Sequence, residues 1–398
     1  MVVTRGRRLG LARRWPELSV YLTLILSCTA LPTIIPTSFA VGGLIFQLYE
    51  PFLAFATLYV LAHHRPSKYV VGRYLLILAS VGIGLVVGML NGNSLQKIYQ
   101  DVRLPIILAV GILVAGGVAN AEVASRCLRL LPWILWISAA VVVLASVAGL
   151  EIGGRTESVV PSADGAATRL LSPATFLAVA VLCGCISLAV AQQITLRSHL
   201  NYVLPAAVIM GLSFARNHLL ALMVAVVFTV VALRSLDAVG GLFKLLATAI
   251  PVFFVCLLVL STLSDNWLSE QVTGYSTRVV DGITGSSLSN DASAAYRMEE
   301  TSHIIPVIER SPIIGYGMGA AYQPAQGPAG QFLYDRAPYY AHNFYLWLLL
   351  KAGVFGLALF LFAVLGPLWR AIRAPNSGQL AAGAATAVPA HHPRKAEP

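Results

Sequence analysis

The residues with the clearest potential for chemistry lie near the C-terminal end of the sequence, in Ala341-His342-Asn343-Phe-Tyr-Leu-Trp-Leu-Leu-Leu-Lys-Ala-Gly353-Val-Phe-Gly356. A neutral imidazole at His342 can accept a proton from a hydroxyl nucleophile, and Asn343 beside it can position that hydroxyl. The same pair is also typical of a helix cap, with the two glycines allowing close packing between helices. Residue types alone favour the cap over the catalytic pair.

The spacing of this stretch resembles the signature of the O-antigen ligase family, which is His-[Asn/Ser/Gln]-x9-Gly-x-x-[Gly/Thr/Tyr]. In this sequence His342 and Asn343 are followed by nine residues, Gly353, two residues and Gly356, with no departure from the pattern. The specific part of the resemblance is confined to about residues 290–360, although the order of apolar helices, large loop and His-Asn is similar as well.

A second glycine-rich motif lies upstream, in Pro312-Ile-Ile-Gly315-Tyr-Gly317-Met-Gly319. It is similar to the Pro-Leu-x-Gly-x-Gly-x-Gly stretch common in the same family and its polymerase relatives. Glycines at alternate positions also occur in dinucleotide-binding fingerprints, but those follow a buried strand, whereas this run follows Ser-Pro in a polar loop. Glycine here permits either a plain tight turn or a close approach of the backbone to a ligand or membrane surface.

The resemblance implies a membrane-embedded glycosyltransferase. Members of the family move a glycan from an undecaprenyl diphosphate carrier to an acceptor on the outer face of the cytoplasmic membrane, without a metal ion. It therefore implies an undecaprenyl-diphosphate-linked glycan as donor and a glycan or glycolipid as acceptor. In that reaction His342 deprotonates the acceptor hydroxyl, Asn343 positions it, and the anomeric configuration inverts. No cofactor is expected.

A lipid diphosphate requires cationic partners, and the planar fork of donors on arginine suits phosphate. Three arginines are candidates for binding it: Arg216, Arg297 and Arg103. The sequence Ser-Phe-Ala-Arg before and at Arg216 resembles the family's Ser-x-Ser-Arg-Gly, although Ala215 and Asn217 depart from it, and Arg297 is similar to a second arginine of the family. The alternatives are a snorkelling interfacial charge at Arg216 and an ion pair between Arg297 and Glu300.

A metal centre has little support in the sequence. His218, His303 and His342 are scattered and have no carboxylate at ligand spacing. Glu299 and Glu300 are adjacent on a predicted helix, so their side chains diverge, and no Asp-x-Asp pair occurs in the predicted outer loops. Mg²⁺ and Mn²⁺ require several oxygen ligands. We therefore expect no metal.

The composition indicates which kind of fold must position these residues. Of 398 residues, 57% are hydrophobic and 11% are charged, whereas a soluble domain has roughly 25% charged residues. This excludes an ordinary cytosolic enzyme, and the hydrophobicity excludes a disordered chain. The net charge of +10 does not indicate nucleic-acid binding, because no basic patch is interleaved with exposed aromatic residues.

The predicted fold is all-α, a polytopic membrane protein. A spanning helix needs about 20 mostly apolar residues, and ten such windows occur. They lie at about residues 18–37, 40–62, 70–90, 104–119, 131–150, 171–191, 202–215, 218–233, 245–263 and 344–369. Pro32 and Pro36 interrupt the first window, and a tight turn is predicted between the seventh and eighth.

The distribution of basic residues orients these helices in the inner or plasma membrane. With both termini in the cytoplasm, 17 of the 27 lysines and arginines lie on the inner side, as the positive-inside rule expects. The predicted organisation is a basic cytoplasmic N-terminus (1–17), helices one to nine (18–263), a large extracytoplasmic loop with the catalytic elements (264–343), the last helix (344–370) and a disordered cytoplasmic tail (371–398). A helix is expected within the large loop, at about 291–310.

A transporter or flippase of lipid-linked glycans is the competing class. Transporters show internal repeats, discontinuous helices in matching halves and polar residues at the membrane midplane. The sequence has no clear repeat, and its polar residues gather at the predicted outer face, which favours an enzyme. Ligase and polymerase differ only in the acceptor. Many ligases have a further helix pair where this chain has a polar tail, which leans toward a polymerase or exopolysaccharide role.

Overall fold

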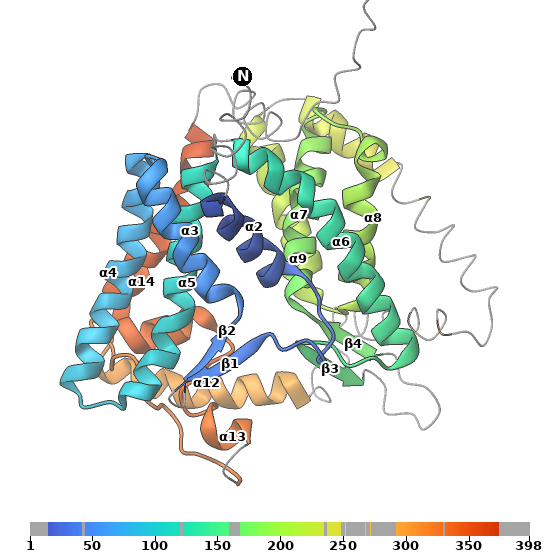
Figure 1. Cartoon of the computed structure of the whole chain (residues 1–398). Helices are drawn as coiled ribbons and strands as arrows, with labels where there is room; N and C mark the ends of the chain where they lie inside the picture. The colour runs from blue at the N-terminus through green and yellow to red at the C-terminus, as the bar shows by residue number, and fades with distance from the viewer. Residues whose placement is uncertain are drawn as a thin grey trace, which may run out of the picture. The chain divides into compact units, whose positions relative to one another are not determined.

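The computed structural model describes residues 15–41, 44–119, 122–158, 168–234, 237–247, 292–328 and 331–373, together with 251, 267 and 271. The chain divides into two compact units, and Figure 1 shows their elements. The first unit contains Met1–Phe52, Ala121–Gly285 and Arg370–Pro398, and the second contains Leu53–Asn120 and Ser286–Trp369. Each unit is described by itself.

The first unit is a group of apolar helices with two small hairpins. Its helices are α2 (Trp15–Cys28), α6 (Glu122–Ala148), α7 (Pro173–Val190), α8 (Leu200–Leu212) and α9 (Arg216–Leu233), with a short 3₁₀ helix at Leu196–His199. The core between α6, α7 and α8 is rich in small side chains, including Ala139, Ala178 and Ala206. Small residues allow helix backbones to approach closely, which is the usual way helices associate where lipid provides no hydrophobic drive.

The second unit carries the predicted catalytic segment. Its helices are α3 (Tyr49–His63, shared with the first unit at its start), α4 (Lys68–Leu90), α5 (Leu95–Val118), α12 (Ala292–Arg310), α13 (Phe332–Asp335) and α14 (Phe344–Arg373). Its core joins residues from α4, α5, α12 and α14, among them Ile77, Ile98, Ile304 and Leu348. The loop between α12 and α13 also enters this core, through the fully buried Met318. The helix expected at about 291–310 is therefore present, as α12.

Five helices are long and apolar enough to cross a membrane, in the part of the chain that the structure describes. They are Lys68–Leu90, Leu95–Val118, Glu122–Ala148, Pro173–Val190 and Phe344–Arg373. Three shorter apolar helices accompany them, Pro16–Cys28, Leu200–Leu212 and Asn217–Leu233. These helices support a multi-pass membrane protein. The window at 245–263 lies mostly outside the described residues, as do 1–14 and 374–398.

The first two predicted spans need correction, and so does the all-α description. Helix α2 ends at Cys28, and the chain then forms an antiparallel hairpin of β1 (Ser38–Val41) and β2 (Leu44–Gln47) before α3 begins. Pro32 and Pro36 stop the helix because proline has no N–H and its ring clashes with the preceding turn. A second hairpin joins β3 (Arg155–Ser158) to β4 (Thr168–Leu171).

Two further helices are longer than predicted. Helix α5 starts at Leu95 rather than near 104, and α6 starts at Glu122 rather than near 131. The predicted windows counted only apolar residues, whereas a helix continues through charged turns when those side chains find partners. As a result, Arg103 lies inside α5 rather than at its start.

Candidate active site

The site is built around one buried carboxylate on α12. Glu300, Ile304 and Ile308 follow one another at four-residue spacing and are 3%, 0% and 7% exposed, so they form the buried stripe of an amphipathic helix. The two isoleucines pack into the core of the second unit. The same periodicity carries Glu300 inward, where an unpartnered carboxylate would be costly.

Glu300 is satisfied by His342. The backbone N–H of His342 donates to both carboxylate oxygens, at 3.1 and 3.0 Å, and the His342 Nδ1 atom lies 3.3 Å from Glu300 Oε1. The side chain of His342 is 26% exposed, against 4% for Glu300. One carboxylate thus fixes both the backbone and the ring of the histidine, and the ring reaches toward solvent.

Three tyrosines complete the surroundings of this pair. The rings of Tyr296 and Tyr340 lie edge-on to the His342 ring, with centroids 5.7 and 5.2 Å away. The Tyr322 hydroxyl donates to Glu300 Oε1 at 3.1 Å and to the Tyr340 carbonyl at 2.8 Å. Burial, together with the negative charge of Glu300, raises the pKa of Tyr322. Tyr322 therefore stays a neutral donor to the carboxylate at physiological pH.

The arrangement sets the chemistry of His342. An ionised carboxylate only accepts hydrogen bonds, so the Nδ1 atom facing Glu300 must carry the proton. The Nε2 atom of the neutral ring then holds a lone pair, and it has no partner among the described residues. Carboxylates orient histidines in this way in metal and catalytic sites. His342 is thus arranged to accept a proton at Nε2.

The segment that leads into His342 is held from several sides. Lys97 on α5 donates to the Asp335 carbonyl at 2.6 Å, and its ammonium group lies 4.4 Å from the centroid of the Tyr339 ring. The Trp347 indole N–H donates to the Tyr339 carbonyl at 3.2 Å. These contacts fix the turn before α14 without using the histidine ring.

Asn343 caps α14. Its Oδ1 atom accepts the backbone N–H groups of Tyr345 and Leu346, at 3.1 and 3.3 Å, which is the geometry of an N-cap. The cap predicted from residue types is therefore confirmed at Asn343. The cap uses Asn343 and leaves the ring of His342 directed at Glu300.

Gly353 divides α14 into two helices, with φ 64° and ψ −171°. This region of backbone space is essentially restricted to glycine. The glycine-rich loop enters the break: the Tyr316 N–H donates to the Leu350 carbonyl at 2.7 Å, and the Val354 N–H donates to the Pro312 carbonyl at 2.9 Å. A Cβ on Gly353 would lie 2.1 Å from the carbonyl oxygen of Ile313. The loop therefore satisfies the backbone groups that the break leaves open.

The other predicted glycines serve the same packing. Gly315, Gly317 and Gly319 all have positive φ angles, and a Cβ on Gly317 would lie 2.0 Å from the backbone nitrogen of Gly88 on α4. Gly356 accepts a hydrogen bond at its carbonyl from Ser80 Oγ, at 2.7 Å. The two glycine motifs of the sequence are thus two sides of one backbone contact, and the glycines of the upstream motif approach protein backbone rather than the predicted ligand or membrane surface.

A buried ion pair fastens this contact. Lys351 Nζ lies 2.7 Å from Asp101 Oδ2 and donates to the Ala320 carbonyl at 2.6 Å. The Gly319 N–H donates to the same Asp101 oxygen at 2.7 Å. Lys351 is 0% exposed, although the sequence gives no reason to separate it from solvated loop charges. The pair joins α5, α14 and the end of the glycine-rich loop.

The comparison with protein families covers this region. Residues 201–361 match the family model described as O-antigen ligase. This match supports the O-antigen ligase/polymerase superfamily for the chain. No curated protein and no solved structure matches the chain. The matched segment contains Glu300, His342 and both glycine motifs, whereas their partners on α4 and α5, such as Lys97 and Asp101, lie outside it.

The three arginines predicted for the diphosphate are divided between the two units. Arg216 begins α9 in the first unit, whereas Arg103 and Arg297 lie on α5 and α12 in the second. Arg297 is exposed. No ion pair joins it to Glu300 among the described residues, so that alternative is wrong: Glu300 points into the core and binds His342. An arginine site for the O-antigen ligase donor stays a prediction.

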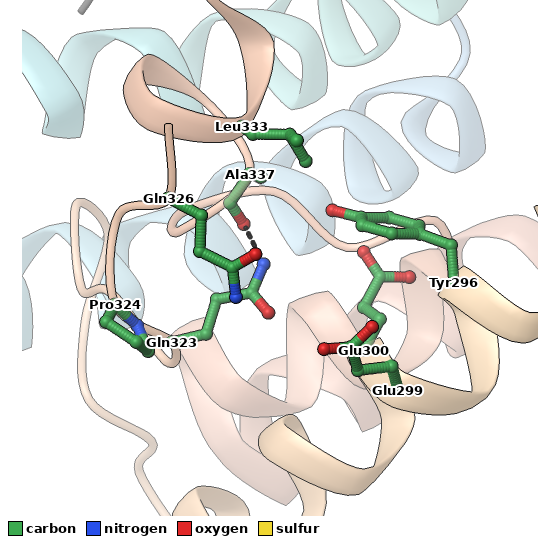
Figure 2. Close-up of a pocket in the computed structure, with 8 residues that line it drawn as sticks. All are labelled: Tyr296, Glu299, Glu300, Gln323, Pro324, Gln326, Leu333 and Ala337. Carbon is green, nitrogen blue, oxygen red and sulfur yellow. Dashed lines mark hydrogen bonds between the residues drawn. The ribbon is translucent and has the colours of Figure 1, made fainter. Parts of the chain in front are cut away.

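A crevice opens beside the histidine, between α12 and the segment that precedes α13. Figure 2 shows Tyr296, Glu299 and Glu300 on one side and Gln323 and Gln326 on the other. The Gln323 carboxamide donates to the Ala337 carbonyl at 3.0 Å. Elsewhere in the described chain, no three His, Cys, Asp or Glu side chains gather as a metal site would require.

Glu300 is the functional residue that sequence reasoning missed. It lies 42 residues before His342, so no spacing rule connects the two. One signal was present: an acid at a position where the α12 pattern, continued through Ile304 and Ile308, calls for an apolar side chain. A buried charge on an apolar stripe needs a partner, and here the partner is the predicted base.

Proposed function

We propose that the protein transfers a glycan from an undecaprenyl diphosphate carrier to a hydroxyl group of a glycan or glycolipid acceptor. The superfamily supports a membrane glycosyltransferase with a lipid-linked donor. The observation that carries the proposal is the hydrogen bond from His342 Nδ1 to the buried Glu300. It gives the family domain an oriented base. The reaction takes place at the outer face of the inner or plasma membrane, with both termini in the cytoplasm.

The reaction is a single displacement. The proton of the acceptor hydroxyl passes to Nε2 of His342, while the hydroxyl oxygen forms a bond to the anomeric carbon of the donor sugar. The bond between that carbon and the diphosphate oxygen breaks, and the electron pair leaves with undecaprenyl diphosphate. Attack opposite the leaving group inverts the anomeric configuration. General base catalysis of this kind typically contributes about 10²–10⁴ in rate.

The remaining roles follow from charge. Arg216 and Arg297, with Arg103 as a third partner, hold the diphosphate and stabilise the charge that develops on it. No metal is needed for that step if the arginines neutralise the leaving group. Asn343 positions the acceptor hydroxyl beside His342, and the apolar helices accept the polyprenyl chain. A growing polymer and a glycolipid present the same hydroxyl chemistry to His342.

The break in α14 at Gly353 differs from the discontinuous helices that are typical of transporters. In transporters the freed backbone groups face a substrate or coupling ion. Here the backbone N–H and C=O groups around Gly353 form hydrogen bonds with the backbone of the glycine-rich loop. The nearby Lys351 forms an ion pair with Asp101. The break therefore supports a packed junction beside the catalytic segment and does not favour a transporter.

The test is glycan transfer in reconstituted liposomes, with an undecaprenyl-diphosphate-linked glycan and a labelled acceptor. His342→Ala should lower transfer by about 10²–10⁴-fold while the protein still inserts and runs as a single species. His303→Ala is the matched control, because His303 bonds only the carbonyl of Glu299 in its own helix, at 2.9 Å. Transfer by His342→Ala at the wild-type rate would falsify the assignment. Movement of the lipid-linked glycan across the bilayer without transfer would favour the flippase.

A further inference from the structure

The crevice in Figure 2 contains a polar group that the protein does not satisfy. The Tyr296 hydroxyl oxygen is buried and forms no hydrogen bond of ordinary geometry among the described residues, although the Gln323 carboxamide lies close enough to lower its pKa. Buried polar groups are normally paired, and those that are not call for an explanation such as a ligand. Burial raises the pKa of Tyr296, with the Gln323 carboxamide opposing that shift, so the hydroxyl is a neutral donor and acceptor.

The groups around this hydroxyl are those that bind sugar hydroxyls. Glu299 is an exposed carboxylate one turn along α12 from Tyr296, and Gln326 presents a carboxamide from the opposite wall. Leu333 adds an apolar side at the top of the crevice in this view. A sugar hydroxyl donates and accepts at once, so it matches a mixture of carboxylate, amide and phenol better than a purely donating or accepting ligand does.

The charge of the crevice limits the ligand further. Glu299 and Glu300 both line it, while Arg297, between Tyr296 and Glu299 in the sequence, is not among its lining residues. Positions i, i+3 and i+4 share one helix face and position i+1 does not. Two carboxylates repel phosphates and acidic sugars, so the diphosphate of the donor does not bind here. The crevice is shallow and open, with enclosed room for about one water-sized group, so it admits a single hydroxyl at the edge of a ring and not a whole sugar.

The position relative to His342 assigns a role. Glu300 belongs to the wall of the crevice and also binds the imidazole, and the Tyr296 ring lies edge-on to the His342 ring. We propose that this crevice is the acceptor subsite, which takes the hydroxyl-bearing edge of a sugar ring without an acidic group and places a neighbouring hydroxyl beside His342. The assignment rests on the proposed function for its role in catalysis, but not for binding.

Binding is measured by saturation-transfer NMR on the full-length protein in detergent, with two matched probe pairs: glucose with glucuronate, and galactose with galacturonate. The neutral member of at least one pair should bind about tenfold more tightly than its acid. Tyr296→Phe removes only the hydroxyl. This variant and Gln326→Ala should each lower the affinity for that neutral sugar by about tenfold. Glu309→Gln, an exposed carboxylate of α12 outside the crevice, should bind like the wild type.

Glu299→Gln sharpens the charge argument, since it preserves shape and removes one negative charge. The preference for the neutral sugar over its acid should then fall from about tenfold toward parity. The proposal is overturned if neither neutral sugar binds, if an acid binds as tightly as its neutral partner in the wild type, or if Tyr296→Phe and Gln326→Ala bind normally. His342→Ala separates the two proposals: it should keep sugar binding and lose transfer. If it keeps both, the base assignment fails and the crevice still stands.

Discussion

The second unit contains two buried carboxylates, each paired with a nitrogen base, and the two pairs differ in what surrounds the base. Asp101 binds Lys351, whose side chain is 0% exposed and whose ammonium group also reaches a backbone carbonyl. Glu300 binds His342, whose side chain is 26% exposed and whose second nitrogen has no partner among the described residues. The first pair is buried, whereas the second leaves the Nε2 atom of His342 available to a ligand.

This difference suits the Asp101–Lys351 pair to a structural role and the Glu300–His342 pair to proton transfer. A fully buried lysine that binds a carboxylate and a backbone carbonyl holds together the elements that carry them. A histidine fixed through Nδ1 and open at Nε2 can move a proton. The same residue classes at similar distances therefore serve different ends, and removing each pair should affect different measurements.

The largest effect is expected from Lys351→Met, which leaves Asp101 buried without its cation. Breaking a buried pair by removing one partner costs about 3–5 kcal/mol of unfolding free energy, so unfolding in detergent should shift strongly to lower temperature. Lys68→Met is the control, because Lys68 is exposed at the start of α4. The double variant Asp101→Asn/Lys351→Met should recover much of the loss, since both charges are then absent. An unchanged transition in the single variant would show that the pair does not fasten the loop.

The comparison also marks where sequence reasoning succeeds. Spacing was sufficient to single out His342, Asn343 and both glycine motifs, because the motifs are local. It could not show that Gly315–Gly319 enters the break at Gly353, since that contact joins segments brought together only by the fold. Glu300 interrupts an apolar stripe of α12, whereas the sequence did not separate Lys351 from solvated loop charges. The sequence did not predict their partners, Asp101 and His342, because each lies on a different element.

The fold shows the same division. Apolar windows located most of the helices, and the helix before the catalytic segment was predicted at the correct place. The windows failed where proline and β-prone residues share an apolar run, as at Ser38–Gln47, because hydrophobicity alone does not distinguish a strand from a helix. The predicted window for α5 was also too short, because it left out the charged first turns that contain Lys97 and Asp101.

Glu300→Gln should produce the next largest effect, and on activity rather than stability. The amide keeps the size of the side chain but no longer requires a proton on Nδ1, so His342 loses its fixed tautomer. Removing a partner that orients a functional histidine typically costs about 10–100-fold, and we expect this in kcat, with little change in KM for the acceptor. The unfolding temperature should stay close to that of the wild type, because the amide fills the same space.

A purely structural role for Glu300 predicts a different outcome. In that case Glu300→Gln would lower the unfolding temperature and the transfer rate together. Glu300→Asp offers a second check, since it restores the charge on a shorter chain and should recover part of kcat. Glu309→Gln on the exposed face of the same helix should change neither measurement.

The smallest effect is expected at Asn343, where capping and catalysis can be separated. Asn343→Ala removes the oxygen that accepts the Tyr345 and Leu346 N–H groups and should cost about 1 kcal/mol of stability. Asn343→Asp keeps an accepting oxygen at the helix N-terminus, so it should retain the stability. It lacks the amide donors, however, and if Asn343 positions the acceptor hydroxyl, transfer should fall several-fold in both variants. Full activity in Asn343→Asp would make Asn343 a cap alone and leave His342 as the single catalytic member of the pair.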